Sequence, residues 1–101
     1  MNDATNTAKQ IALTANTRVR LEKGCKAREI DKGTTAKITE ITPMGADYGH
    51  CVRVTFMMLN GFKSGKTFSF YARHMNRLTD PIIRMNDGNP LHTIEIRRVT
   101  A

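Results

Sequence analysis

Residues 52–72 read VRVTFMMLNGFKSGKTFSFYA and contain two alternating arms around a loop with two glycines. An extended chain points successive side chains to opposite faces, so a strand buried on one face alternates apolar and polar residues. The segments 52–58 and 67–72 both show this alternation. We therefore expect an antiparallel β-hairpin with one buried face. The side chains expected on that face are Val52, Val54, Phe56, Met58, Phe68, Phe70 and Ala72.

The alternation continues on the N-terminal side of this hairpin. Residues 18–22 alternate polar and apolar side chains, and residues 34–42 are rich in Thr and Ile, which favour strands. Ile41 is out of phase with Ile38, so we expect a β-bulge between them. Two further strands are therefore predicted before the hairpin.

The C-terminal side adds a short turn and a second hairpin. Residues 73–78 are too polar for a strand and too few for a full helix, which predicts a single 3₁₀ or helical turn. Residues 82–85 and 91–99 are apolar runs on either side of Asp87-Gly88, a pair that favours a hairpin turn. We expect a C-terminal hairpin over residues 82–99.

These segments predict a mainly β fold in one domain. Five to seven short antiparallel strands in a chain of 101 residues bury a common face most readily by curling into a small barrel. The expected organisation is a flexible tail or short helix over residues 1–17, followed by a single small β-barrel over residues 18–101. An open sheet packed on an N-terminal helix is the structural alternative.

The charge of the chain indicates the type of partner. Lys and Arg number 16 against 9 Asp and Glu, which gives a net charge of +7. Such an excess favours polyanions, so RNA or DNA is the preferred partner, although a basic surface without any ligand is the simpler alternative. No apolar run is long enough to cross a bilayer, and no secretory signal is visible, so we expect a cytoplasmic protein without a membrane partner. Cys25 and Cys51 are then reduced thiols.

Several motifs that resemble catalytic or metal sites fail on spacing or context. Residues 61–67 resemble part of a phosphate-binding loop, but Asn60 occupies the position of the first glycine and a strand follows instead of a helix. The two cysteines and three histidines lack the paired spacing of zinc ligands. No base can be assigned to either cysteine. We therefore predict no catalytic residue, no metal, no cofactor and no enzyme activity.

Basic residues remain as candidates for binding. If the hairpins pair in sequence order, the outer face carries cations from several strands and loops together with one aromatic ring, which suits phosphate contact and base stacking. The predicted nucleic-acid-binding residues are Lys37, Arg53, Lys63, Lys66, Tyr71, Arg73, His74 and Arg77.

A resemblance to a known family supports this interpretation. The runs Val19-x-Leu21-x-Lys23-Gly24, Ile30-x-x-Gly33-x-x-Ala36-x-Ile38 and Val52-Arg53-Val54-x-Phe56 are similar to the KOW type of SH3-like barrel, found in bacterial transcription elongation factors and ribosomal proteins. The resemblance covers roughly residues 18–79. It implies an SH3-like barrel that binds RNA, DNA or protein without catalysis, with a role for Gly24, Gly33 and the basic loop after Gly24. That loop, residues 25–29, lacks the additional glycine common in the family.

The predicted function is a non-enzymatic binding module that contacts nucleic acid through a basic barrel face. One alternative is a protein–protein adaptor, such as a small phage or mobile-element protein that modifies a host complex, with Met57, Tyr71 and the 82–99 hairpin as its contact surface. Another is a structural subunit that assembles through an open sheet edge. The sequence leaves open the choice of RNA or DNA and the oligomeric state.

Overall fold

A computed structural model describes residues 12–99 of the chain. It contains six strands and three short 3₁₀ turns in this range, which confirms the prediction of a mainly β fold. The strands are β1 (Arg18–Lys23), β2 (Thr35–Pro43), β3 (Val52–Met58), β4 (Thr67–Ala72), β5 (Ile83–Asn86) and β6 (Thr93–Arg98). The turns are η1 (Lys26–Arg28), η2 (Ala46–Tyr48) and η3 (Met75–Thr79).

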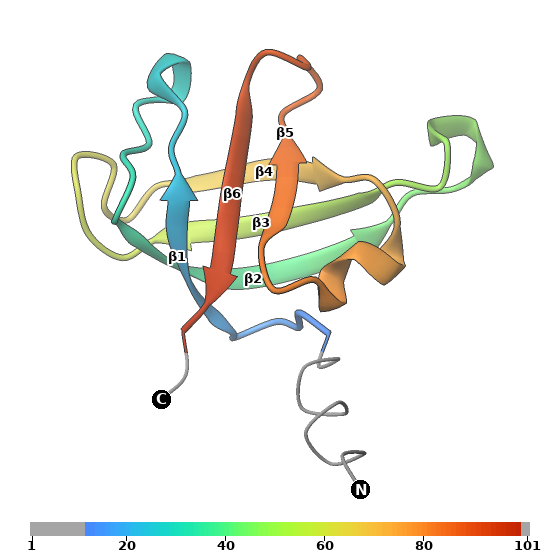
Figure 1. Cartoon of the computed structure of the whole chain (residues 1–101), viewed down its shortest axis with the longest axis horizontal. Helices are drawn as coiled ribbons and strands as arrows, with labels where there is room; N and C mark the ends of the chain where they lie inside the picture. Colours follow the sequence, from blue (N-terminus) through green and yellow to red (C-terminus); the bar gives the residue numbers. More distant parts are fainter. Residues whose placement is uncertain (1–11, 100–101) are drawn as a thin grey trace, which may run out of the picture.

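The six strands form one closed antiparallel barrel in sequence order (Figure 1). Each strand pairs with the next, and β6 returns to pair with β1, so the open-sheet alternative does not describe this part of the chain. In Figure 1, β2, β3 and β4 run across the view while β1, β5 and β6 cross in front of them. The barrel is therefore flattened into two crossing layers with the core between them.

The two predicted hairpins and the predicted bulge are present. In the β2–β3 ladder Ile38 lies opposite Phe56, the register then shifts, and Ile41 lies opposite Val54. The shift adds one residue to β2, and it returns Ile41 to the inner side, where it packs against the core. The out-of-phase isoleucine thus marks a real change of register.

The core consists of the inward residues of the six strands together with a few loop residues. Phe56 is fully buried near its centre, with its ring 5.7 Å from that of Phe70 and 6.1 Å from that of Phe68. Among the described residues no polar or charged residue is buried. Leu78 of η3 also belongs to the core. Its burial anchors this turn against the barrel between β4 and β5.

The prediction for residues 1–17 falls largely outside the described residues, which begin at residue 12. Residues 12–17 contain no helix, and they are attached to the barrel by backbone hydrogen bonds. The Leu13 N–H donates to the Leu78 carbonyl at 2.9 Å, and the Ile38 N–H donates to the Thr17 carbonyl at 2.8 Å. Leu13 is buried, so this segment covers the barrel end next to η3. No described helix is long and apolar enough to span a bilayer.

Gly24 provides a test of the packing between β1 and the loop that follows it. A Cβ atom at this position would overlap the Ile30 carbonyl oxygen and lie 2.8 Å from the Lys32 nitrogen, both backbone atoms that cannot rotate away. We expect Gly24→Ala to lower the free energy of unfolding by about 1–3 kcal/mol, measured by urea denaturation.

Gly45 is the matched control because its φ is −78° and a Cβ there would meet no atom within 4 Å. Gly45→Ala is expected to be neutral or to stabilise by up to about 1 kcal/mol. Equal effects of the two substitutions would contradict the close approach at Gly24.

Candidate nucleic-acid interface

A row of outward polar side chains crosses four strands of the barrel around Tyr71. Arg53 of β3 lies opposite Tyr71 of β4, Tyr71 lies opposite Asn86 of β5, and Asn86 lies opposite Thr93 of β6. Their sequence neighbours Val52, Phe70, Met85 and Ile94 point into the core, so alternation along each strand turns this row outward. Tyr71 is therefore held by the sheet between a guanidinium and an amide.

A groove lies beside this row because β4 and β5 separate from each other. The two strands pair only at Tyr71 and Asn86, since the chain between them descends to form η3 before it returns as β5. The resulting groove has a volume of about 1130 Å³. Its walls come from the η2 loop, the end of β4, η3 and the β5–β6 hairpin. Its lining includes the rings of Tyr48 and Tyr71, the amide of Asn86, three arginines (Arg73, Arg77 and Arg84) and three carboxylates (Asp80, Asp87 and Glu95).

The arginines of this region differ in their pairing. Arg77 Nη1 lies 3.7 Å from an Asp80 carboxylate oxygen, and Arg84 lies 3.1 Å from Glu95; the Arg84 side chain is 76% exposed. Exposed pairs of this kind contribute little to stability, so both arginines can exchange their partner for another anion at small cost. Arg53 and Arg73 form no ion pair with any residue in the range 12–99. Two free guanidiniums therefore flank Tyr71.

Asp87, at the far wall of the groove, has a structural role. It accepts hydrogen bonds from Arg28 at 3.0 Å and from the Asn89 backbone N–H at 3.1 Å, and it lies 3.0 Å from His92 Nδ1. Burial raises the pKa of this carboxyl, but the bonds from Asn89, His92 and Arg28 outweigh burial and leave the pKa below its ordinary value of 3.8. The cluster joins η1 to the β5–β6 hairpin and keeps that wall in place.

Four of the eight predicted residues come together here, namely Arg53, Tyr71, Arg73 and Arg77. His74 lies next to them in sequence but lines a separate hollow of about 530 Å³ between the β2–β3 loop and η3. That hollow is otherwise lined by Pro43, Met44, His50, Met75 and Asn76.

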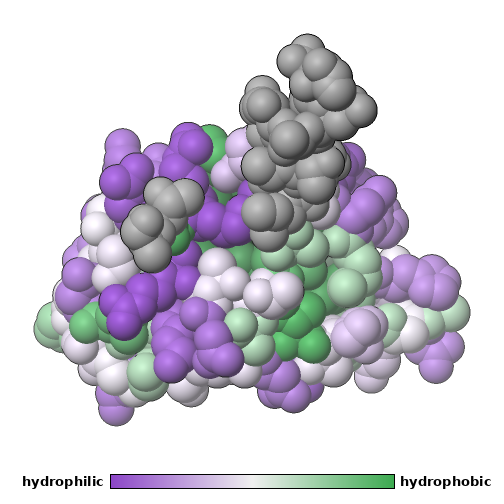
Figure 2. Space-filling view, turned by 90° about the horizontal axis from the view of Figure 1, so that it is seen from below, coloured by the Kyte–Doolittle hydropathy of each residue, from purple (hydrophilic) through white to green (hydrophobic). Residues whose placement is uncertain are grey.

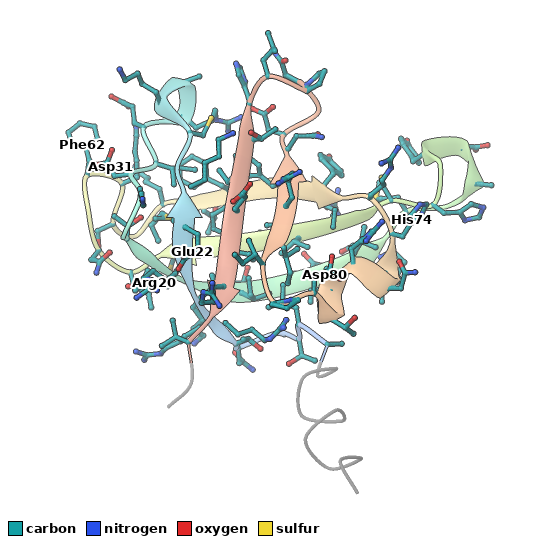
Figure 3. All side chains as sticks on the ribbon, viewed as in Figure 1. Arg20, Glu22, Asp31, Phe62, His74 and Asp80 are labelled. Carbon is teal, nitrogen blue, oxygen red and sulfur yellow. The ribbon has the colours of Figure 1, made fainter. Side chains whose placement is uncertain are left out.

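The other three predicted residues lie toward the opposite end of the barrel. Lys37 is opposite Met57, four residues along β3 from Arg53, which corresponds to about 13 Å. Lys63 forms an ion pair with Glu29 at 2.8 Å, and Lys66 is exposed in the same β3–β4 loop. Figure 3 shows this separation, with Phe62 of that loop and His74 at opposite ends of the molecule. The basic residues thus form two groups.

The sequence prediction missed most of the groove lining, including Tyr48, Arg84 and Asn86. Tyr48 is 66% exposed in the η2 loop, while Arg84 and Asn86 occupy outward positions on β5. An aromatic residue in a polar loop with glycines on both sides was a usable signal for Tyr48. Arg84 and Asn86 gave no such signal, because their place depends on the register between β4 and β5.

Comparisons of this chain with protein families, with curated proteins and with solved structures find no match. Within residues 12–99, no group of three or more His, Cys, Asp or Glu side chains is arranged to hold a metal ion.

Replacement of Asp87 tests the structural role of its cluster. Asp87→Asn keeps the shape but removes the charge that Arg28 and His92 contact, so we expect a loss of about 1–3 kcal/mol in the free energy of unfolding at neutral pH. Asp47→Asn is the control, because Asp47 is exposed and makes no ion pair within the described residues.

The lowered pKa of Asp87 also predicts that its contribution to stability depends on pH. The folded-state pKa of Asp87 is lowered, so its contribution is present above the ordinary value of 3.8 and is lost as pH falls through the folded-state pKa. The stability difference between wild type and Asp87→Asn should therefore shrink in urea titrations from about pH 7 to about pH 3. A difference that stays constant over this range would show that the carboxylate charge does not carry the effect.

Proposed function

We propose that this protein is a non-enzymatic nucleic-acid-binding module whose contact surface is the groove beside Tyr71. The observation that carries the proposal is the pair of free guanidiniums, Arg53 and Arg73, on either side of an outward aromatic ring. Arginine presents several N–H donors in a planar fork that matches phosphate oxygens. Arg53 lies across the β3–β4 ladder from Tyr71 and the exposed Arg73 follows Tyr71 by two residues, and neither guanidinium is paired with a carboxylate of the described chain.

Binding of this kind is dominated by phosphate neutralisation. Arg77 and Arg84 add two more cations from the groove walls, whose carboxylate partners are weakly held. Each phosphate neutralised releases counterions, so the logarithm of the binding constant falls with the logarithm of salt concentration, with a slope of roughly −3 to −4 for four contacts. Contacts to phosphate carry little sequence information, so the proposed binding is weakly sequence-specific.

The type of barrel forms part of the same proposal. A small closed antiparallel barrel with a 3₁₀ turn between β4 and β5 supports the assignment to SH3-like barrels of the KOW type. Gly24, at which the chain turns back close to Ile30, supports the role that the resemblance gives to that glycine. Both cysteines are free thiols, which supports a reducing, cytoplasmic setting.

A protein–protein adaptor is the second candidate, and one observation favours it. Leu91, at the tip of the β5–β6 hairpin, is 86% exposed and is therefore accessible to a protein partner. Apolar residues also gather on the underside of the barrel, bordered by hydrophilic ones (Figure 2). Binding through such surfaces would respond weakly to salt, so a salt series separates the two functions.

The proposed function predicts which arginines control binding. In fluorescence anisotropy with labelled RNA and DNA, Arg53→Ala and Arg73→Ala should each weaken binding about five- to tenfold at low salt and reduce the salt slope by about one. Arg20→Ala removes the same charge from β1, where Arg20 is bonded to Glu22 at 2.8 Å, and it should change affinity much less.

Two results would count against the proposal. One is the absence of binding to any nucleic acid near about 50 mM salt, where phosphate contacts are strong. The other is an equal loss of affinity in all three variants, which would indicate a general charge effect instead of a defined surface.

A further inference from the structure

Both tyrosines of the chain line the same groove, although they come from different elements. Tyr48 ends η2 in the β2–β3 loop, and Tyr71 lies near the end of β4. The phenylalanines are placed differently: Phe56 and Phe70 are buried, Phe68 packs against the core, and Phe62 is exposed in the loop at the other end of the barrel. The aromatic residues that carry a hydroxyl are thus gathered where the free arginines lie.

From this arrangement we infer that the groove binds an unpaired nucleobase against the tyrosine rings, and that the protein selects single-stranded over double-stranded nucleic acid. The inference rests on the proposed function and adds the form of nucleic acid that the site recognises. Rings of Tyr provide flat surfaces for stacking, and such stacking is tolerant of base identity because every base has a π face.

The walls of the groove suit the body and the edge of a base. Ile82 contributes apolar surface, since it lines the groove and is 38% exposed. Asn86 lies directly across the ladder from Tyr71, and its side-chain oxygen Oδ1 accepts a hydrogen bond from the Gly88 N–H at 2.9 Å. Its amide NH₂ has no bond to any residue in the described range, so it retains two donors for the acceptor atoms on a base edge.

The cations lie where the backbone of a strand would continue. Arg73 follows Tyr71 by two residues on the lip of the groove, while Arg53 is next to Tyr71 across the ladder. A base that enters the groove therefore places the phosphates on either side of it near a guanidinium. The groove volume, about 1130 Å³, exceeds the range of roughly 300–1,000 Å³ typical of small-ligand pockets, so it has room for a nucleotide and for its chain to leave.

Duplex nucleic acid cannot use this site without losing base pairs. A base in a duplex reaches the rings only after it is unpaired and unstacked, which costs free energy that a single strand does not lose. The arginines still contact the phosphates of a duplex. We therefore expect measurable duplex binding and about tenfold tighter binding of a single strand, the difference that one stacked base provides.

The test compares short single strands of RNA and of DNA with the matching duplexes, using the full chain and fluorescence anisotropy. Tyr48→Leu and Tyr71→Leu should each weaken single-strand binding about tenfold and leave duplex affinity within about twofold. Tyr71→Phe retains the ring and should bind like wild type. Phe62→Leu removes an exposed aromatic residue from the opposite loop and should also have no effect.

A single strand that contains 2-aminopurine gives a second readout. Stacking of this base on a tyrosine ring is expected to quench its fluorescence. Wild type should therefore quench the fluorescence on binding, and the Leu variants should quench it less. Because Tyr71 is half-buried, thermal unfolding is used to check that each variant is folded. If Tyr71→Leu is unstable, Tyr48→Leu still tests the inference, because Tyr48 is exposed.

The possible outcomes distinguish a failure of the base-binding site from a failure of the proposed function. Equal affinity for single and double strands, with no effect of the tyrosine variants while Arg53→Ala and Arg73→Ala still weaken binding, would overturn the base site and leave the proposed function standing. No binding of any nucleic acid at low salt would overturn both. If only RNA or only DNA is preferred as a single strand and the tyrosine variants weaken that binding, the base-binding site is supported and the type of nucleic acid that it binds is identified.

Discussion

Pairing between β1 and β6 is the constraint on which the rest of this structure depends. Leu21 lies opposite Ile96 and Val19 opposite Arg98, so strands from the two ends of the described chain share one ladder. A six-stranded sheet of short strands that stayed open would leave its apolar face uncovered and its two edge strands unpaired. Closure lets both layers bury that face, and Phe56 then lies among residues from strands that are remote in sequence. The core and the outer surface are both consequences of this pairing.

Closure also determines where the barrel is weak, and the candidate site lies there. The ladders between β2, β3 and β4 are long, whereas β4 and β5 share only the pair Tyr71–Asn86. The chain leaves β4 to place Leu78 in the core and returns as β5. Arg98 of β6 holds this excursion in position, because its guanidinium donates to the Leu78 carbonyl at 2.9 Å and to the Asp80 carbonyl at 2.7 Å. The groove is thus a by-product of the core that η3 completes.

The sequence predicted most of the fold because its signals were local. Alternation around Val54 and Phe70 marked the central hairpin, and the phase change at Ile41 marked the bulge. The site was predicted only in part, since its composition depends on pairings between distant segments. Arg53 and Tyr71 belong to one hairpin, so their proximity could be inferred. The ion pair that Lys63 forms with Glu29 depends on loops from two different hairpins, and alternation contains no information about it.

The charges of the chain show why a net value is a poor guide to a binding surface. Much of the excess positive charge lies beside carboxylates that already use it, as in the contacts of Glu22 with Arg20 at 2.8 Å and with Arg97 at 3.5 Å. These arginines lower the pKa of Glu22, the Arg20 hydrogen bond most of all, so the carboxylate stays ionised and its neighbours are less available to a ligand. The surface around Tyr71 combines an outward aromatic ring with two arginines, Arg53 and Arg73, that have no carboxylate partner within the described chain. A polyanion meets two unpaired guanidiniums at that point, next to the groove that barrel closure leaves open and whose lining also contains Asp80, Asp87 and Glu95.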